Sequence, residues 1–334
     1  MTTMQPEAEG SVSATTLTWG NDHVSLTFSW SEDAPVSCVA IVLAGREAFP
    51  VYRLPFVEVL TADAGHRPAS GRLAHTEHGT RMRYVDHSTD VVNGVRKLII
   101  RQRSGDLEAE VVLTAQADVS GVTSFAKVTN NGTDPIVLRS LPSWVAGFSD
   151  PGYSGDSLAG WDRVTGVNDW LGEGRWTRAA LRGPEFVYLA EHLTGHNPRG
   201  SLSTSSVGTW STGHHLPTGV LSSSITGLAL AWQIEHNGAW RWEIGEDTDG
   251  GYLALAGPTD SDSGWTRVLT AAESFSSVPV TVVFAPDEEA AVHSLTDHRR
   301  ATRRAHPDNA AMPVVFNDYM NTLDGDPTTE KLLP

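Results

Sequence analysis

Strand-like patterns of apolar and polar positions dominate the chain from its start to about residue 285. Residues 23–30 alternate with a period of two, and the turn residues 20–22 precede them, which is typical of a β-hairpin. Other strand-like segments follow: 38–43, 55–60, 98–103, 107–115, 123–129, 136–141, 228–235, 240–244, 251–255 and 278–284. Short strands with turn residues between them predict an all-β fold, a large two-sheet antiparallel β-sandwich.

The middle of the chain, about residues 143–218, has a different pattern. It is rich in Gly, Ser and Trp, and we expect few regular strands there. A long irregular stretch in a compact domain is usually functional or packs over another element. Within it, Trp170, Arg175 and Trp176 form a cluster that suits a carbohydrate-lined rim, because indole rings stack on sugars and a guanidinium donates hydrogen bonds. Packing in the core or at an interface remains the alternative for these residues.

A change of pattern follows residue 285. Acidic residues open a predicted helix, four arginines lie near its end, and Pro307 ends it, in agreement with the helix dipole. Residues 312–321 then predict a short strand, and residues 325–334 a loop that enters a helix. We therefore expect a sandwich over 1–285, a linker helix over 286–306 and, over 307–334, the start of a β/α unit that cannot bury its own faces.

Charge and cysteine content narrow the classes of function. The 334 residues carry a net charge of −16, which argues against nucleic-acid and anionic-membrane partners. No apolar run is long enough to span a membrane, and the first residues do not resemble a secretory signal. Cys38 is the single cysteine, so the chain cannot form an internal disulfide. We expect a cytoplasmic protein that acts on a neutral ligand.

Several segments resemble glycoside hydrolase family 36, the α-galactosidases and related enzymes. The most specific are residues 313–321 and 325–334, which resemble the start of the family's catalytic barrel. Residues 265–275 with 278–284 resemble the last strands of its N-terminal sandwich, residues 293–300 its linker helix and, more loosely, residues 213–217 a histidine-containing segment. The resemblance is specific over 265–334 and architectural over 1–260.

The resemblance implies a function and a division of the fold. It implies the front portion of a retaining hydrolase of terminal α-galactosides, with a sandwich that supports a (β/α)8 barrel and shapes its mouth. A retaining mechanism needs two carboxylates, which the resemblance places on later barrel strands, so this chain has no assignable catalytic residue. We expect no cofactor, no activity of the chain alone, and a homo-oligomer of the whole protein. The alternative is a free-standing carbohydrate-binding or assembly module.

The end of the predicted barrel strand supplies further candidates. Active sites of barrels form where strands meet their following loops, which favours substrate contacts for Asn317, Asp318, Tyr319 and Asn321. Asp318 can accept hydrogen bonds from sugar hydroxyls, and Tyr319 can stack on a sugar face. Ordinary capping of a strand end is the alternative. The histidine pairs 214–215 and 75/78 lack a third ligand at a characteristic spacing, so we expect no metal site.

Overall fold

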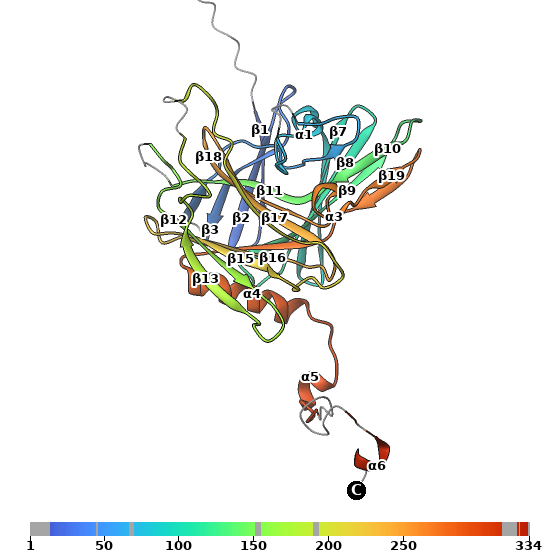
Figure 1. Ribbon diagram of the computed structural model, residues 1–334. Helices are drawn as coiled ribbons and strands as arrows, with labels where there is room; N and C mark the ends of the chain where they lie inside the picture. The colour runs from blue at the N-terminus through green and yellow to red at the C-terminus, as the bar shows by residue number, and fades with distance from the viewer. Residues whose placement is uncertain are drawn as a thin grey trace, which may run out of the picture. The chain divides into compact units, whose positions relative to one another are not determined.

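The computed structural model describes residues 14–44, 46–66, 70–150, 155–189, 194–315, 326 and 328–332, with backbone only at 46–50. The chain divides into two compact units, Met1–His298 and Arg299–Pro334. Among the described residues every strand pairing is antiparallel, and helices are few (Figure 1). The predicted all-β sandwich is confirmed.

The strands of the first unit form four sheets in the described part of the chain. One four-stranded sheet has the order β1-β2-β3-β4 (Thr15–Gly20, Val24–Trp30, Ser37–Leu43, Arg46–Pro50). A second has the order β11-β18-β17-β14 (Pro142–Phe148, Gly250–Ala256, Trp240–Asp247, Ser201–Ser206). A small sheet has the order β19-β10-β5 (Arg267–Leu269, Ile136–Ser140, Leu60–Thr61).

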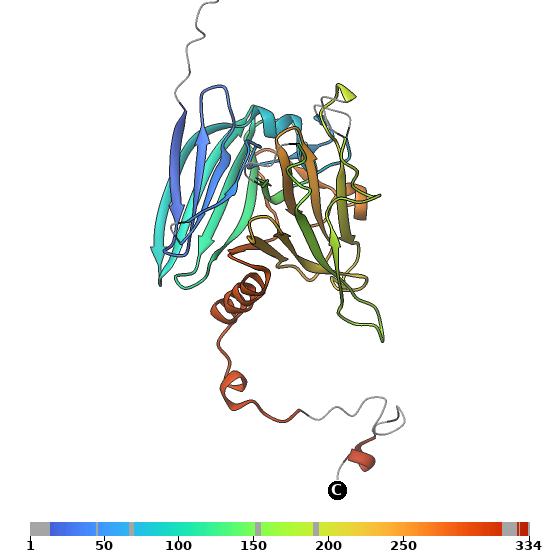
Figure 2. The ribbon, with the colours of Figure 1, turned by 90° about the vertical axis from the view of Figure 1, so that its left-hand side faces the viewer.

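The largest sheet has ten described strands and forms one layer of the sandwich. Its strand order is β13-β12-β15-β16-β21-β9-β8-β7-β6, and β20 (Ser274–Ser276) also pairs with β9. In that order, the strands are Arg175–Ala180, Trp161–Val167, His215–Ser223, Ala229–Ile234, Val280–Ala285, Gly121–Asn130, Leu107–Ala115, Val95–Ser104 and Arg83–Val92. Figure 2 shows β1–β4 lying along one half of this layer. The β11-β18-β17-β14 sheet packs against the other half.

Aromatic contacts hold the layers together. Trp30 of β2 stacks on Tyr84 of β6 with ring centroids 4.2 Å apart. In the other half, Trp232 of β16 meets Trp242 of β17 edge to face at 5.6 Å. These residues belong to one apolar core or pack closely against it, so a single core runs through both halves. The ten-stranded sheet therefore packs against both four-stranded sheets through one continuous core.

The helices are short except for α4. They are α1 (Glu77–Arg81), α3 (Asp260–Ser263), α4 (Glu288–Thr302), α5 (Asp308–Ala311) and α6 (Thr329–Leu332). Helix α4 lies where the sequence predicts a helix, and it buries Ala291, Leu295 and His298. Ala291 and Leu295 join a second apolar cluster with small residues of the large sheet, among them Ala229 and Ala231. The helix therefore covers part of the outer face of that sheet.

Two predictions about strands are wrong. Residues 55–60 form a strand only at Leu60, although the segment is buried. The polar member of its alternating pattern, Glu58, points inward, where its carboxylate accepts hydrogen bonds from the backbone N–H groups of His75 (2.8 Å) and Thr76 (2.9 Å). The segment is thus fixed by a buried carboxylate and not by a strand ladder.

The middle of the chain contains more strands than its sequence predicts. β11, β12, β13 and β14 all lie between residues 142 and 206. All seven residues of β11 are buried, and all six residues of β13 are exposed, so neither strand shows the alternation of a half-buried strand. β14 consists largely of serine and threonine. These patterns do not distinguish a strand from a loop.

The second unit contains the segment predicted as the start of a barrel. Its described residues include α5 and α6, and α6 begins at Thr329, close to the predicted helix start. Residues 312–315 form no strand, and Val314 and Val315 are exposed. The candidate residues Asn317, Asp318, Tyr319 and Asn321 lie outside the described residues. The barrel strand therefore stays a prediction.

Candidate functional site

The predicted aromatic cluster lies on a β-hairpin at the edge of the large sheet. β12 and β13 pair from Asp162 with Ala180 to Val167 with Arg175, and residues 168–174 connect them. β13 is the terminal strand of the sheet. Figure 2 shows this hairpin projecting from the end of the layer. Side chains on its outer strand and connecting loop are therefore accessible.

Asn168 organises the connecting loop. Its side-chain Nδ2 donates to the carbonyl of Thr212 (2.5 Å), and its Oδ1 accepts from the backbone N–H of Gly174 (2.9 Å). Its backbone N–H donates to the carbonyl of His214 (2.8 Å). Gly174 has a φ of 63°, a left-handed conformation that glycine adopts at low cost. The hairpin loop is therefore closed on itself and tied to the neighbouring loop 207–214.

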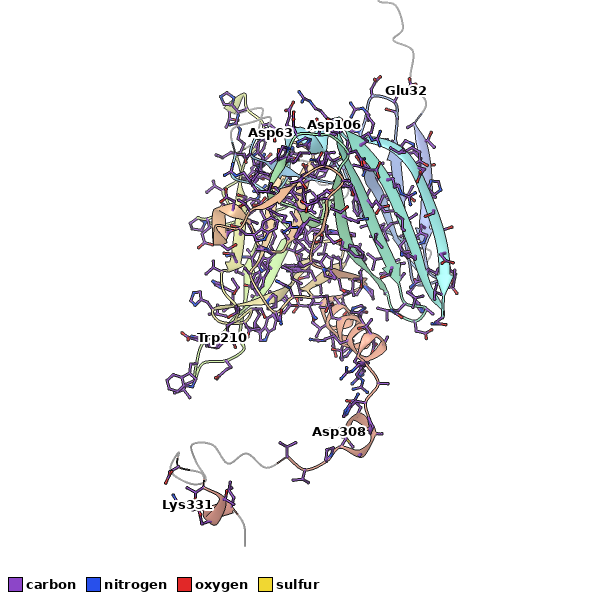
Figure 3. The ribbon with its side chains drawn as sticks, turned by 90° about the vertical axis from the view of Figure 1, so that its right-hand side faces the viewer. Glu32, Asp63, Asp106, Trp210, Asp308 and Lys331 are labelled. Carbon is purple, nitrogen blue, oxygen red and sulfur yellow. The ribbon has the colours of Figure 1, made fainter. Side chains whose placement is uncertain are left out.

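Three tryptophans on these two loops and on β13 are exposed. Trp170 is 69% exposed, Trp176 50% and Trp210 56%, whereas the other eight of the eleven tryptophans are buried or partly buried. Trp176 lies opposite Gly166 in the strand register, and glycine has no side chain to cover the indole. Figure 3 shows Trp210 at the end of the sandwich. Core packing, the alternative considered for Trp170 and Trp176, does not fit these exposures.

Arg175 adds hydrogen-bond donors to the same hairpin. Its Nε donates to the carbonyl of Gly172 (2.9 Å), which fixes the side chain against the loop. Its terminal nitrogens have no partner among the residues that the structure describes. Exposed indoles can stack on a flat, hydroxyl-bearing molecule, and a guanidinium can donate hydrogen bonds to it. Arg175 and Trp176 are consecutive in β13, so their side chains point to opposite faces of the strand. A protein surface that offers the same groups would also fit.

The sequence singled out Trp170, Arg175 and Trp176, and the structure places all three on this hairpin. It did not single out Trp210. The link between the two loops runs through Asn168, which is 44 positions from Thr212 and shows no pattern that marks it. We call the set of Trp170, Arg175, Trp176 and Trp210 the β12–β13 platform.

The histidines do not form a metal site in the described residues, where no group of three or more His, Cys, Asp or Glu side chains could hold a metal ion. The rings of His214 and His215 pack edge to face, with centroids 4.4 Å apart. His78 Nδ1 lies 3.1 Å from Ser104 Oγ, and His75 Nε2 lies 3.8 Å from a carboxylate oxygen of Asp247. Burial lowers the pKa of His75 to about 4. Each histidine thus has a local packing role.

The described residues also contain no helix long and apolar enough to cross a membrane. A comparison with protein-family models finds no match to this sequence, and a comparison with curated proteins finds none either. Similarity is instead found among solved structures.

Solved α-galactosidases have the same fold over most of this chain. The GH36 α-galactosidase AgaA from Geobacillus stearothermophilus is 16% identical, with a TM-score of 0.60 over 82% of this chain and 40% of that chain. A variant of that enzyme in complex with raffinose is 15% identical, with a TM-score of 0.64 over 88% of this chain and 44% of that chain. The α-galactosidase from Lactobacillus brevis is 15% identical, with a TM-score of 0.62 over 86% and 41%.

This chain spans about 40% of the length of the structures that it matches. At such identities the similarity concerns the fold, and function does not follow from a shared fold alone. The resemblance to glycoside hydrolase family 36 that residues 265–334 indicate is confirmed at this level: the chain has the fold of a part of the GH36 α-galactosidases.

Proposed function

We propose that this chain is the sandwich portion of a larger retaining glycoside hydrolase that acts on terminal α-galactosides. The observation that carries the proposal is the shared fold with GH36 α-galactosidases over 82–88% of the chain, at TM-scores of 0.60–0.64. Two of those structures contain the oligosaccharides raffinose and stachyose. The acidic charge of the chain also favours a neutral substrate.

The proposed chemistry needs residues beyond the sandwich. Retaining hydrolysis uses two carboxyl groups about 5–5.5 Å apart, one as nucleophile and one as acid and base. The family resemblance places both on later barrel strands. Residues 307–334 contribute the start of the barrel in this proposal, where Asp318 accepts hydrogen bonds from sugar hydroxyls, Tyr319 stacks on the sugar, and Asn317 and Asn321 complete the contacts. The isolated chain is then inactive.

The β12–β13 platform has a binding role in this proposal. Its exposed indoles and Arg175 form one side of the mouth that receives the oligosaccharide. Removing one stacking ring deprives the ligand of roughly 40 Å² of apolar contact, about 1 kcal/mol at 25 cal/mol per Å². We expect Trp170→Ala and Trp176→Ala each to raise KM about fivefold in the complete enzyme. Val268→Ala, which removes an exposed apolar side chain from β19, is the control and leaves KM unchanged.

The test of the barrel contacts compares two carboxylates in the complete product of the reading frame. Asp318→Ala removes a charge-assisted hydrogen bond worth about 1.5–3 kcal/mol, so we expect kcat/KM for an aryl α-galactoside to fall roughly 10- to 150-fold. Asp326→Ala is the control, because Asp326 Oδ2 binds Lys331 Nζ at 2.6 Å on the protein's own surface. Equal activity of both variants removes Asp318 from the substrate site.

The organisation and location of the protein are part of the same proposal. Residues 1–285 form the sandwich, 286–306 the linker helix and 307–334 the first part of the barrel. The single cysteine favours a reducing compartment, the cytoplasm. We expect the complete protein to be a homo-oligomer, which light scattering coupled to size-exclusion chromatography measures directly.

The second candidate is a carbohydrate-binding or assembly module without hydrolase activity. The exposed indoles of the β12–β13 platform favour it, because large exposed aromatic groups mark interaction sites. This candidate predicts oligosaccharide or protein binding by the isolated chain, with no turnover from any form of the protein.

A further inference from the structure

A small polar pocket lies at the other end of the β12–β13 hairpin. Its volume is about 230 Å³, and its lining includes Asp156, Arg182, Tyr188, Glu246, Asp247 and Thr248. Residue 156 precedes β12 and residue 182 follows β13, whereas the platform loop joins the opposite ends of these strands. Six strand residues at about 3.3 Å each separate the two places by roughly 20 Å. The pocket is therefore distinct from the platform.

Arg182 forms the centre of the pocket. Its Nε and Nη2 each lie 2.7 Å from a carboxylate oxygen of Asp156, and Nη2 also lies 2.6 Å from Oε2 of Glu246. The guanidinium carbon lies 4.8 Å from the ring centroid of Phe186 and 5.2 Å from that of Tyr188. The remaining nitrogen, Nη1, is buried and has no acceptor among the described residues. The side chain is therefore fixed, and its unpaired nitrogen is shut off from the pocket, so the guanidinium contributes charge and not a free donor.

Asp247 supplies an acceptor on the pocket wall. It is mostly buried, and the one hydrogen bond that its carboxylate receives from the described residues comes from the backbone N–H of Asp249 (3.0 Å). Burial raises the pKa of this carboxyl to about 6, so it is still largely ionised at neutral pH. A ligand hydroxyl could donate a hydrogen bond to the Asp247 carboxylate, which otherwise accepts only the bond from Asp249 among the described residues.

Size and charge limit what can bind. A volume of about 230 Å³ lies below the roughly 300–1,000 Å³ of pockets for drug-sized ligands, which indicates one small ring and not an oligosaccharide. The lining carries three carboxylates and one guanidinium, and this excess of negative charge repels phosphates and carboxylates. The ring of Tyr188, which is partly exposed, offers an apolar surface beside these polar groups.

We propose that this pocket binds a single neutral hexose unit, at a site on the sandwich separate from the β12–β13 platform. Such a ligand carries several hydroxyl donors for Asp247 and Glu246, and C–H groups for the face of Tyr188. The net negative lining also attracts an organic ammonium ion, but a simple ammonium ion has neither the set of hydroxyl donors nor the C–H face. The pairing of hydroxyl donors with an apolar face therefore favours the sugar, and galactosamine tests the cationic alternative.

The test uses the purified 334-residue chain and does not depend on hydrolysis. Galactose, glucose and mannose are each titrated by calorimetry and by ligand-observed NMR, alongside galactosamine as a cation and galacturonate as an anion. We expect at least one neutral hexose to bind with a Kd of about 1 mM or tighter, the range of weak specific complexes. We expect galacturonate to bind at least tenfold more weakly than that hexose.

Variants locate the binding. Asp247→Asn and Tyr188→Ala should each weaken the hexose at least fivefold, whereas Val268→Ala on β19 should leave it unchanged. Tyr188 is partly exposed, so its variant remains informative if changes at buried Arg182 impair folding. Three results overturn the proposal: no neutral hexose binds, galactosamine binds more tightly than every neutral hexose, or binding persists unchanged in both pocket variants. A failure here leaves the hydrolase proposal intact, because hydrolysis is measured on the complete protein.

Discussion

Replacing Leu295 by alanine tests whether helix α4 is an integral part of the sandwich. Leu295 is 5% exposed and packs in the apolar cluster on the outer face of the large sheet. The change removes about three methylene equivalents from the core, about 2.4 kcal/mol at 0.8 kcal/mol each, before any cavity is counted. Its surroundings include Ala229, Ala231 and Ala291, and a surface helix can settle onto such small neighbours. We therefore expect a loss of about 2–3 kcal/mol.

The matched control is Val292→Ala, three positions earlier on the same helix. Val292 is 45% exposed, and changes at such positions usually stay within about 0.5 kcal/mol. Urea unfolding followed by tryptophan fluorescence gives both free energies of unfolding, and the Tm should decrease by roughly 3–5 °C for Leu295→Ala alone. Equal midpoints for the two variants, or a larger loss for Val292→Ala, would refute the docking of α4 on the sheet.

Three further outcomes follow from the described contacts. Burial raises the pKa of Cys38 to about 12. Its thiol should therefore react with a disulfide reagent at pH 8 only as fast as the protein unfolds. Rapid labelling of the native chain would contradict this. Asn168→Ala should lower the free energy of unfolding by about 1–3 kcal/mol. It should also speed hydrogen exchange at the amide of Gly174, whereas exchange in β8 stays unchanged. Unchanged protection at Gly174 would contradict the anchoring role of Asn168. Acrylamide should quench the fluorescence of the exposed indoles Trp170, Trp176 and Trp210 first. A variant with all three replaced by Phe should therefore lose the readily quenched fraction of the fluorescence and keep the rest. If that fraction persisted, other indoles would be the accessible ones.

The sequence predicts the sandwich well where one face of a strand is buried. Strands β2, β8 and β9 coincide with segments in which about one residue in two points into the core. Continuous apolar runs also predict β3, β18 and β21. The prediction is wrong where neither pattern marks the strand. β11 is buried throughout and β13 exposed throughout, and burial of Glu58 depends on donors from residues 75 and 76, which local sequence does not indicate.

The helix shows the same principle at the level of single residues. A helical pattern over 286–306 is evident, and α4 occupies Glu288–Thr302. Which face it buries depends on the sheet beneath: His298 is buried because it reaches Thr281 Oγ1 (3.0 Å) and Glu235 (3.3 Å). Val292, a typical core residue, remains exposed. The identity of the buried polar residue follows from tertiary partners and not from hydrophobicity.

The two candidate sites differ in how many of their residues the sequence indicates. Trp170 and Trp176 were recognisable as a cluster, but buried Trp161 lies in the same Gly- and Trp-rich stretch, so exposure required the sheet order. The hexose pocket combines residues from 156 to 248 that no motif connects. It forms because the β17–β18 turn lies beside the segments before β12 and after β13.

The central claim is that the chain serves as the sandwich portion of a retaining α-galactosidase. The most direct measurement follows an aryl α-galactoside by proton NMR, with the isolated 334-residue chain and with the complete product of its reading frame. We predict no turnover by the isolated chain. From the complete protein we predict that α-galactose is released first, because two displacements retain the anomeric configuration. Turnover by the isolated chain, first release of β-galactose, or an inactive complete protein would each contradict it.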